Sequence, residues 1–228
     1  MIYSNFYLFF ILFIVSHQAN AFRVDSLLKV MNNQDNSIVI SSDLQNGREF
    51  IHMTLSEVIL NGKNKGEEVP LAMNNVSSWP VLIEPAEVVL NAGDEIRLKI
   101  IRNSEQQADD RVIGISFIPD PEKIHANSSS LQVSVGYKTW LILPGSSIFK
   151  GDINAYRHGD KITINNASNK IVRALSGSCI NQKDSECVNN MILIPGASKS
   201  IDVEQEGKNT FVFYSFSDVA KKIKEITL

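Results

Sequence analysis

The sequence predicts an all-β protein made of two β-sandwiches. Short runs rich in β-branched and aromatic residues follow one another, each bounded by Gly, Asn, Asp, Ser or Pro. No helical pattern long enough for a βαβ unit lies between them, which excludes an alternation of strands and helices. A break at Pro144-Gly145 divides the chain after residue 21 into parts of about 120 and about 80 residues. The first part has the size of an immunoglobulin-like domain, and the second is a smaller sandwich.

The strand pattern is a period of two in apolar and polar residues, typical of strands with one face in a core. It covers residues 37–42, 50–60, 81–90, 95–101, 111–118, 131–143, 161–165, 170–175, 190–194 and 210–216. Helices are expected only near the two ends, over residues 26–31 and 219–226.

The charge of the chain is nearly balanced, with 22 Lys and Arg against 25 Asp and Glu and a formal net charge of −3. A sequence-independent nucleic-acid partner needs a basic surface and is therefore not expected. With 43% apolar and 21% charged residues, the composition is that of a globular chain and too apolar for a disordered one.

The first 21 residues have the features of a secretory signal. They contain no Lys, Arg, Asp or Glu, and their apolar run over residues 6–15 is too short to cross a bilayer. Ala19 and Ala21 place small residues where a signal peptidase recognises them. We expect cleavage after Ala21, so that the mature chain begins at Phe22; a buried N-terminal strand is the alternative. No later segment has the length of a membrane span, so membrane insertion is not expected.

Two cysteines remain in the mature chain, Cys179 and Cys187, and a polar stretch separates them. In an exported protein this spacing favours a disulfide, which would remove roughly 2–3 kcal/mol of unfolded-state entropy. A metal site would need further ligands, and no His is near. A redox C-x-x-C motif is excluded by the spacing, so a structural bridge is the preferred interpretation over a metal or redox role.

Catalytic constellations are missing from the sequence. It has no G-x-S-x-G elbow, no P-loop and no H-E-x-x-H motif. His52 lies in a strand pattern and is expected to be a surface or satisfied histidine. The pairs Asp109-Asp110 and Glu67-Glu68 lie in polar segments and are expected to be solvated turns instead of acid/base dyads. We therefore predict no enzyme activity, no cofactor and no metal site.

Three segments together resemble the periplasmic chaperones of the chaperone–usher pilus pathway. Residues 79–100 hold two apolar strands around a Pro, a Gly turn and a strand that carries Arg97. Residues 129–138 are similar to the last strand of the family's first domain. Residues 161–173, with the later Leu-Ile-Pro-Gly at 193–196, resemble the opening strands and a turn of its second domain.

The cysteine pair sharpens this resemblance. Cys179 and Cys187, with the strand that follows them, are similar to the second domain of chaperones for alpha-type pili, the common-pilus and colonisation-factor types. Two positions depart from the family pattern. Its Tyr-Arg before the long loop is Ile113-Gly114 here, and its Arg before the interdomain Pro is Leu143. The resemblance therefore does not carry over the family's interdomain salt bridge.

The resemblance implies a fold, a function and a location. The fold would be two immunoglobulin-like sandwiches in an L- or boomerang-like arrangement, with a signal peptide over residues 1–21, a subunit-binding domain over 22–145 and a disulfide-containing domain over 146–228. The function would be to fold and cap pilus subunits in the periplasm by donor-strand complementation. The partners would be pilin subunits and an outer-membrane usher. An exported pilus subunit or adhesin is the alternative, and a secreted hydrolase is a weaker one.

The predicted donor strand is identified through this resemblance. A pilus subunit lacks its last strand, and β-augmentation by a partner completes its sheet and fills its apolar groove. Leu131, Val133 and Val135 supply the alternating apolar side chains, while Gln132 and Ser134 face the other way. Ordinary core packing of this strand is the alternative.

The family also holds the subunit's C-terminal carboxylate with basic residues, since a partly desolvated carboxylate needs cations. Lys138 is the first candidate for this anchor because it follows the donor residues on the same strand. Arg23 and Lys29 are the candidates near the N-terminus. A solvent-facing lysine is the alternative for Lys138.

Export can be tested by intact-mass measurement of protein recovered from the periplasm. The mass should correspond to a chain that begins at Phe22, because the signal peptide is removed. Recovered material that still carries residues 1–21 would contradict this prediction.

The disulfide can be tested by alkylation of the exported protein without reductant, which should label neither Cys179 nor Cys187. Replacement of both by Ser should destabilise the second domain by roughly 2–3 kcal/mol, measured by denaturant unfolding. Strand donation should not change, because both residues lie outside the first domain. Labelling of either thiol before reduction would rule out the bridge.

Overall fold

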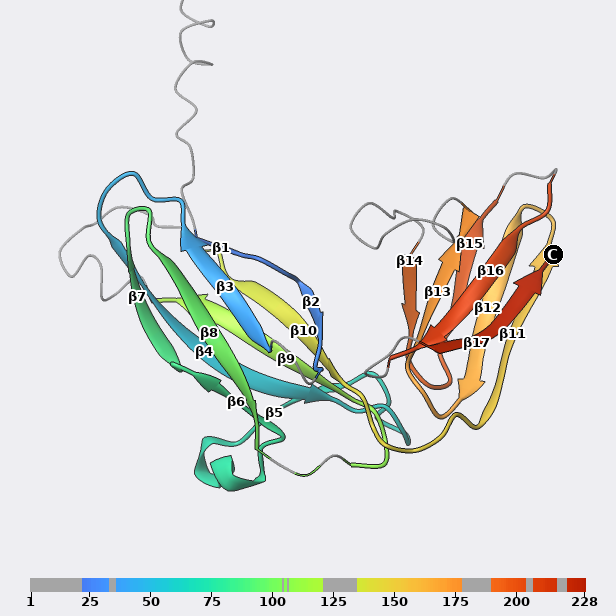
Figure 1. Cartoon of the computed structure of the whole chain (residues 1–228), viewed down its shortest axis with the longest axis horizontal. Helices are drawn as coiled ribbons and strands as arrows, with labels where there is room; N and C mark the ends of the chain where they lie inside the picture. The colour runs from blue at the N-terminus through green and yellow to red at the C-terminus, as the bar shows by residue number, and fades with distance from the viewer. Residues whose placement is uncertain are drawn as a thin grey trace, which may run out of the picture.

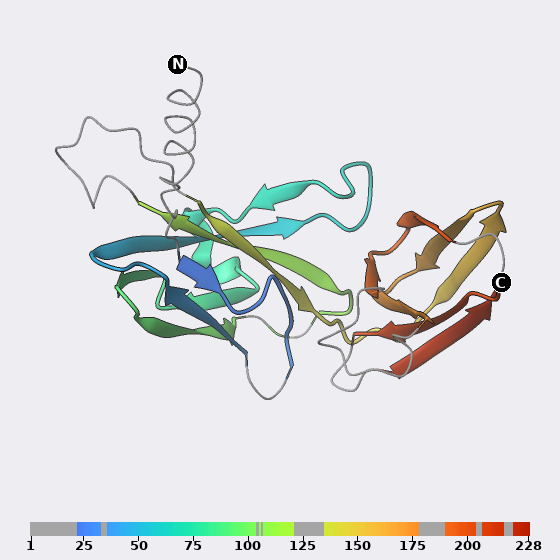
Figure 2. The ribbon, with the colours of Figure 1, turned by 90° about the horizontal axis from the view of Figure 1, so that it is seen from above.

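The computed structural model describes residues 22–32, 36–103, 105, 107–120, 135–177, 190–203, 207–216 and 221–228. The predicted signal peptide, two of the predicted donor residues and both cysteines lie outside the described residues, namely residues 1–21, Leu131, Val133, Cys179 and Cys187. The described chain forms two β-sandwiches set at an angle to each other (Figure 1), and they appear as separate lobes from above (Figure 2). The predicted all-β class and two-sandwich arrangement are confirmed.

In the described part of the chain, the first sandwich has ten strands in two sheets. One sheet has the order β1 (Phe22–Val24), β3 (Ser37–Ser42), β8 (Glu95–Arg102) and β6 (Val81–Glu84). The other has the order β2 (Leu28–Val30), β10 (Tyr137–Leu143), β9 (Arg111–Pro119), β4 (Arg48–Val58) and β5 (Glu68–Pro70), with β7 (Glu87–Asn91) also paired to β4. A short 3₁₀ helix, η1 (Met73–Ser78), follows β5.

The core of this sandwich follows from the period of two. On β9, Ile113, Ile115 and Phe117 are fully buried. Ile38 and Ile40 of β3 face them from the other sheet and belong to the same apolar cluster. Each such side chain contributes about 1.5–3 kcal/mol when it is fully buried, so the alternation determines which face of each strand points inward.

The second sandwich is smaller. One of its sheets has the order β11 (Gly151–His158), β12 (Lys161–Ser168) and β15 (Ser198–Asp202). The other has the order β14 (Asn190–Leu193), β13 (Val172–Ser176), β16 (Thr210–Ser215) and β17 (Lys221–Thr227). Its core contains Ile162 and Ile164 of β12 packed with Phe211 and Phe213 of β16.

Both predicted helices are wrong. Residues 219–226 overlap β17, which pairs antiparallel with β16. A register shift leaves Ile223 as an extra residue between Lys222 and Lys224. This bulge lets Ile223 and Ile226 both pack on the core although they are three residues apart, a spacing that imitates a helix. The sequence pattern could not distinguish the two, because the decisive partner is β16.

Residues 26–31 contain β2 instead of a helix. Strand β2 runs parallel to β10. The amide of Trp140 donates to the Leu27 carbonyl at 2.9 Å, and the amide of Met31 donates to the Ile142 carbonyl at 2.8 Å. A single helical turn has few internal hydrogen bonds, so pairing with a neighbouring strand satisfies this backbone better.

Other strands differ from prediction for similar reasons. The run at residues 81–90 is two strands, β6 and β7, which belong to different sheets. Strands β1, β5, β11 and β15 were not predicted. The first two are only three residues long, and β11 and β15 are the outer strands of their sheet, where polar residues hide the period of two.

A buried ion pair joins the two sandwiches. The Lys170 ammonium lies 2.6 Å from Asp110 Oδ1, and the two side chains are only 6% and 1% exposed. Lys170 lies just before β13 of the second sandwich, and Asp110 lies just before β9 of the first. The other carboxylate oxygen of Asp110 accepts from the amide of Ile171 at 2.7 Å. The prediction of a solvated turn is therefore wrong for Asp110.

The linker residue Gly145 completes this junction. Its amide donates to Asp110 at 2.8 Å, and its carbonyl accepts from Lys170 at 2.9 Å. A Cβ atom at this position would collide with the backbone of Ala108 and Asp109, so only glycine fits.

Apolar side chains from both sandwiches shield the junction from water. Val112 and Ile142 of the first sandwich form a buried cluster with Leu60 and with Ile171 of the second. Ion pairs in such surroundings are costly to break, because removing one partner leaves an uncompensated buried charge.

The junction predicts unequal effects of two lysine substitutions. Lys170→Met should destabilise the protein by about 3–5 kcal/mol, because Asp110 is left buried and unpaired. Lys161→Met is the matched control: Lys161 is paired with Asp202 at 3.6 Å, but both side chains are exposed. The control should cost no more than about 1 kcal/mol. Equal losses in denaturant unfolding of the two variants would contradict a junction-specific role.

Candidate functional site

Strand β10 has an open edge at its N-terminal end. Its partner β2 pairs only with Trp140, Leu141 and Ile142. The hydroxyl of Thr139 still donates to the Ser26 carbonyl at 2.7 Å. Among the described residues, no strand pairs with that edge at Tyr137 or Lys138. Unpaired backbone at a sheet edge is the feature that β-augmentation uses.

The chain reaches this edge through Val135 and Gly136. The Val135 side chain is well exposed, with 49% of the residue accessible. A Cβ atom on Gly136 would lie 2.8 Å from the Phe117 carbonyl oxygen, so the backbone here passes close to β9. Of the three predicted donor residues, the structure describes only Val135, and it places this residue at the surface.

On the core-facing side, β10 is held by Phe22 of β1. The Tyr137 ring meets the Phe22 ring edge to face, with 5.1 Å between their centroids, and Phe22 is almost fully buried. Phe22 is the residue at which the mature chain is predicted to begin. Strand β1 thus anchors the open end of β10 from beneath.

On the other face of the sheet, Lys138 takes part in a polar cluster, which we call the Lys138 cluster: Ser56, Glu68, Gly114, Lys138 and Trp140. The Lys138 ammonium is ion-paired with Glu68 Oε1, and the Ser56 hydroxyl donates to the same oxygen. The ammonium also lies 5.2 Å from the centroid of the Trp140 ring. Hydrogen bonds from Lys138 and then Ser56 lower the pKa of Glu68, so the carboxylate is stabilised in its charged form.

Gly114 makes room for this cluster. A Cβ atom there would lie 2.6 Å from Ser56 Oγ, 3.1 Å from the Trp140 ring and 3.3 Å from Glu68 Oε1. The Lys138 and Glu68 side chains can therefore meet over β9 only because this strand position carries no side chain. Glycine inside a strand often marks such a close approach, which is the signal that could have located the cluster.

The other two basic candidates do not join Lys138. Lys29 pairs in register with the core residue Leu141, so it points to the core-facing side of the sheet, whereas Lys138 points to the other side. Its ammonium binds Asp25 at 2.9 Å and the Ser37 carbonyl. Arg23 is exposed and lies 3.4 Å from Asp43. The structure thus places the three predicted basic residues in three separate environments.

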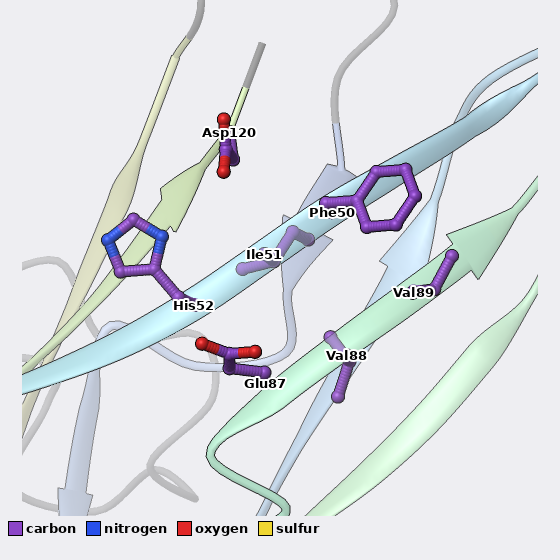
Figure 3. A pocket seen from close by; sticks show the side chains of 7 residues that line it. All are labelled: Phe50, Ile51, His52, Glu87, Val88, Val89 and Asp120. Atoms are coloured by element: carbon purple, nitrogen blue, oxygen red, sulfur yellow. The ribbon is translucent and has the colours of Figure 1, made fainter. Parts of the chain in front are cut away.

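A small cavity lies where β9 ends and the chain leaves the described part (Figure 3). Its volume is about 220 Å³. Figure 3 shows His52 and Phe50 of β4, Glu87 of β7 and Asp120 after β9 around it. His52 is half-buried. Within the described residues, no group of three His, Cys, Asp or Glu side chains could hold a metal ion.

A second cavity of about 480 Å³ lies beside the interdomain junction. Its wall includes Glu57 and Arg111, whose side chains form two parallel hydrogen bonds of 2.6 and 2.5 Å. This paired geometry fixes both side chains and balances the two charges against each other. In the part of the chain that the structure describes, no helix is long and apolar enough to span a membrane.

Sequence comparison places residues 24–144 in the family described as "CS5 fimbrial protein N-terminal domain". An Escherichia coli protein described as "Uncharacterized 25.9 kDa protein in CS5 3'region" is 30% identical over 199 residues. The match covers 86% of this chain and 87% of that protein.

Solved structures of fimbrial chaperones share the fold. The class 5 fimbriae chaperone CfaA is 18% identical with a TM-score of 0.53, and the match covers 91% of this chain and 97% of that chain. A chain of the Salmonella enterica complex between SafA pilin and the SafB chaperone is 13% identical with a TM-score of 0.54, covering 93% and 98% of the two chains. By the match over its first sandwich and its E. coli relative, the chain belongs to the CS5 fimbrial protein family, and it has the two-sandwich fold of the chaperones of fimbrial assembly.

Proposed function

We propose that this protein is a periplasmic chaperone that folds and caps pilus subunits by donor-strand complementation and delivers them to an outer-membrane usher. The observation that carries the proposal is the open edge of β10, which continues to the exposed Val135. The fold shared with CfaA, and with the chaperone of the SafA–SafB complex, supports it. These fold matches do not favour the alternative that the chain is itself a pilus subunit.

The donated strand would extend the inner face of β10. Side chains alternate along a strand, so Leu131, Val133 and Val135 have the same parity as Tyr137 and Leu141, which pack against the core of the first sandwich. Donation would therefore make the subunit's core continuous with the chaperone's core. Each donated side chain would contribute roughly 1.5–3 kcal/mol once it is buried in the subunit.

Lys138 is our proposed anchor for the subunit's C-terminal carboxylate. It lies three residues beyond Val135, which is about 10 Å along an extended chain. Its neighbours Trp140 and Ser56 can hold an ammonium and a carboxylate together. Arg23 and Lys29 are weaker candidates, because each is engaged at a different place.

The domain limits belong to the same proposal: a signal peptide over 1–21, a subunit-binding domain over 22–145 and a second domain over 146–228. No catalytic role is proposed.

The donor strand can be tested with two substitutions of opposite parity. Val133→Glu should abolish recovery of the chaperone–subunit complex from the periplasm and leave the melting temperature of the free chaperone unchanged, because the proposed strand buries this side chain in the subunit and not in the chaperone's own core. Gln132→Glu introduces the same charge one residue away and should retain at least partial recovery. If Val133 were an ordinary core residue, a buried unpaired charge would cost several kcal/mol and lower the melting temperature sharply. That result would reject strand donation.

A further inference from the structure

The Lys138 cluster already holds a carboxylate, and that carboxylate comes from the protein itself. We infer that Glu68 takes the place of the subunit's terminal carboxylate: Glu68 is bound to Lys138 in the free chaperone and is displaced when a subunit binds. This inference rests on the proposed function and adds a residue that determines when Lys138 is available.

The first argument is the chemistry of the cluster. A carboxylate needs a cation and hydrogen-bond donors, and Lys138 and Ser56 provide both at a single oxygen of Glu68. The Trp140 ring lies 5.2 Å from the ammonium and is independent of Glu68. If Glu68 moved away, Lys138, Ser56 and Trp140 would form a ready site for another carboxylate.

The second argument is that Glu68 is the removable member of the cluster. It belongs to β5, a strand of three residues at the edge of the sheet, which is in register with Ser56, Glu57 and Val58 of β4. All three residues of β5 are exposed. Short, exposed edge elements open at low free-energy cost, whereas Lys138 and Trp140 lie on β10, which is paired to β9 along its whole length.

The third argument is the free energy of the exchange. Replacement of one carboxylate by another leaves the net charge of the cluster unchanged, and no charge is stranded beside the apolar Trp140 ring. The occupied state also shields Lys138 from other anions before the correct subunit arrives. Specificity would then come from the donor strand, because only a subunit that engages it holds its carboxylate next to Lys138 long enough to compete.

The test uses the subunit that co-purifies with the wild-type chaperone when the neighbouring genes are expressed with it. Glu68→Gln keeps the size of the side chain and removes its charge. It should bind this subunit about two- to fivefold more tightly, the range expected when a partly exposed ion pair no longer competes. Glu67→Gln, an exposed neighbour with the same change of charge, is the control and should bind like wild type.

Two further measurements separate competition from a structural role. In a Lys138→Met background, Glu68→Gln should change affinity by less than about 1.5-fold, because the competition acts through Lys138. Carboxyl ¹³C NMR of the wild-type protein should show the pKa of Glu68 rising toward its ordinary value when the subunit binds, since it loses Lys138 as a partner.

The outcomes are distinguishable. If wild type recovers no subunit at all, the proposed function fails and the inference fails with it. If wild type binds the subunit but Glu68→Gln binds equally or more weakly, or the pKa of Glu68 stays low in the complex, Glu68 is only a structural partner of Lys138. The inference is then overturned while the chaperone function stands.

Discussion

The buried pair of Asp110 and Lys170 is the constraint on which the arrangement of the two sandwiches depends. Its four polar contacts reach both sandwiches and the linker glycine, and the apolar cluster around Ile171 keeps water away. A buried pair of this kind contributes little net stability compared with an apolar contact, but only one geometry satisfies it. It therefore selects one relative placement of the sandwiches and penalises the others.

Strand β10 connects the interdomain junction with the open sheet edge. Strand β10 ends at Leu143, next to the junction, and begins at the open edge near Val135. Because β9 pairs with β10 along its full length, the junction and the open edge are connected by two rigid strands. A partner that adds a strand at this edge would meet a preformed template, which reduces the entropy lost on binding.

Two glycines allow close backbone approaches at the interdomain junction and at the Lys138 cluster. Gly145 allows the linker to touch the segment before β9, and Gly114 allows three side chains to meet above β9. Neither glycine needs a left-handed conformation; each is required because a methyl group would not fit. The family pattern has Tyr-Arg where this chain has Ile113-Gly114, and the Lys138 cluster fills the space that a larger side chain would take.

The fold class, the two-sandwich division and most core strands could be predicted from the sequence, because alternation at runs such as residues 111–118 is a local property of the chain. It also pointed to Lys138 and to the edge near Val135, through resemblance to a family. Tertiary structure alone decided the rest. The apolar residues of β17 have a helix-like spacing, which only the bulge in its pairing with β16 explains. Strands β1 and β5 are too short to show a period of two. Asp110 and Lys170 are 60 positions apart in the sequence. The members of the Lys138 cluster on β4, β5 and β10 are separated from one another across strands by 12 to 84 positions. Which charges become buried together depends on strand pairing across such distances, and no local pattern records it.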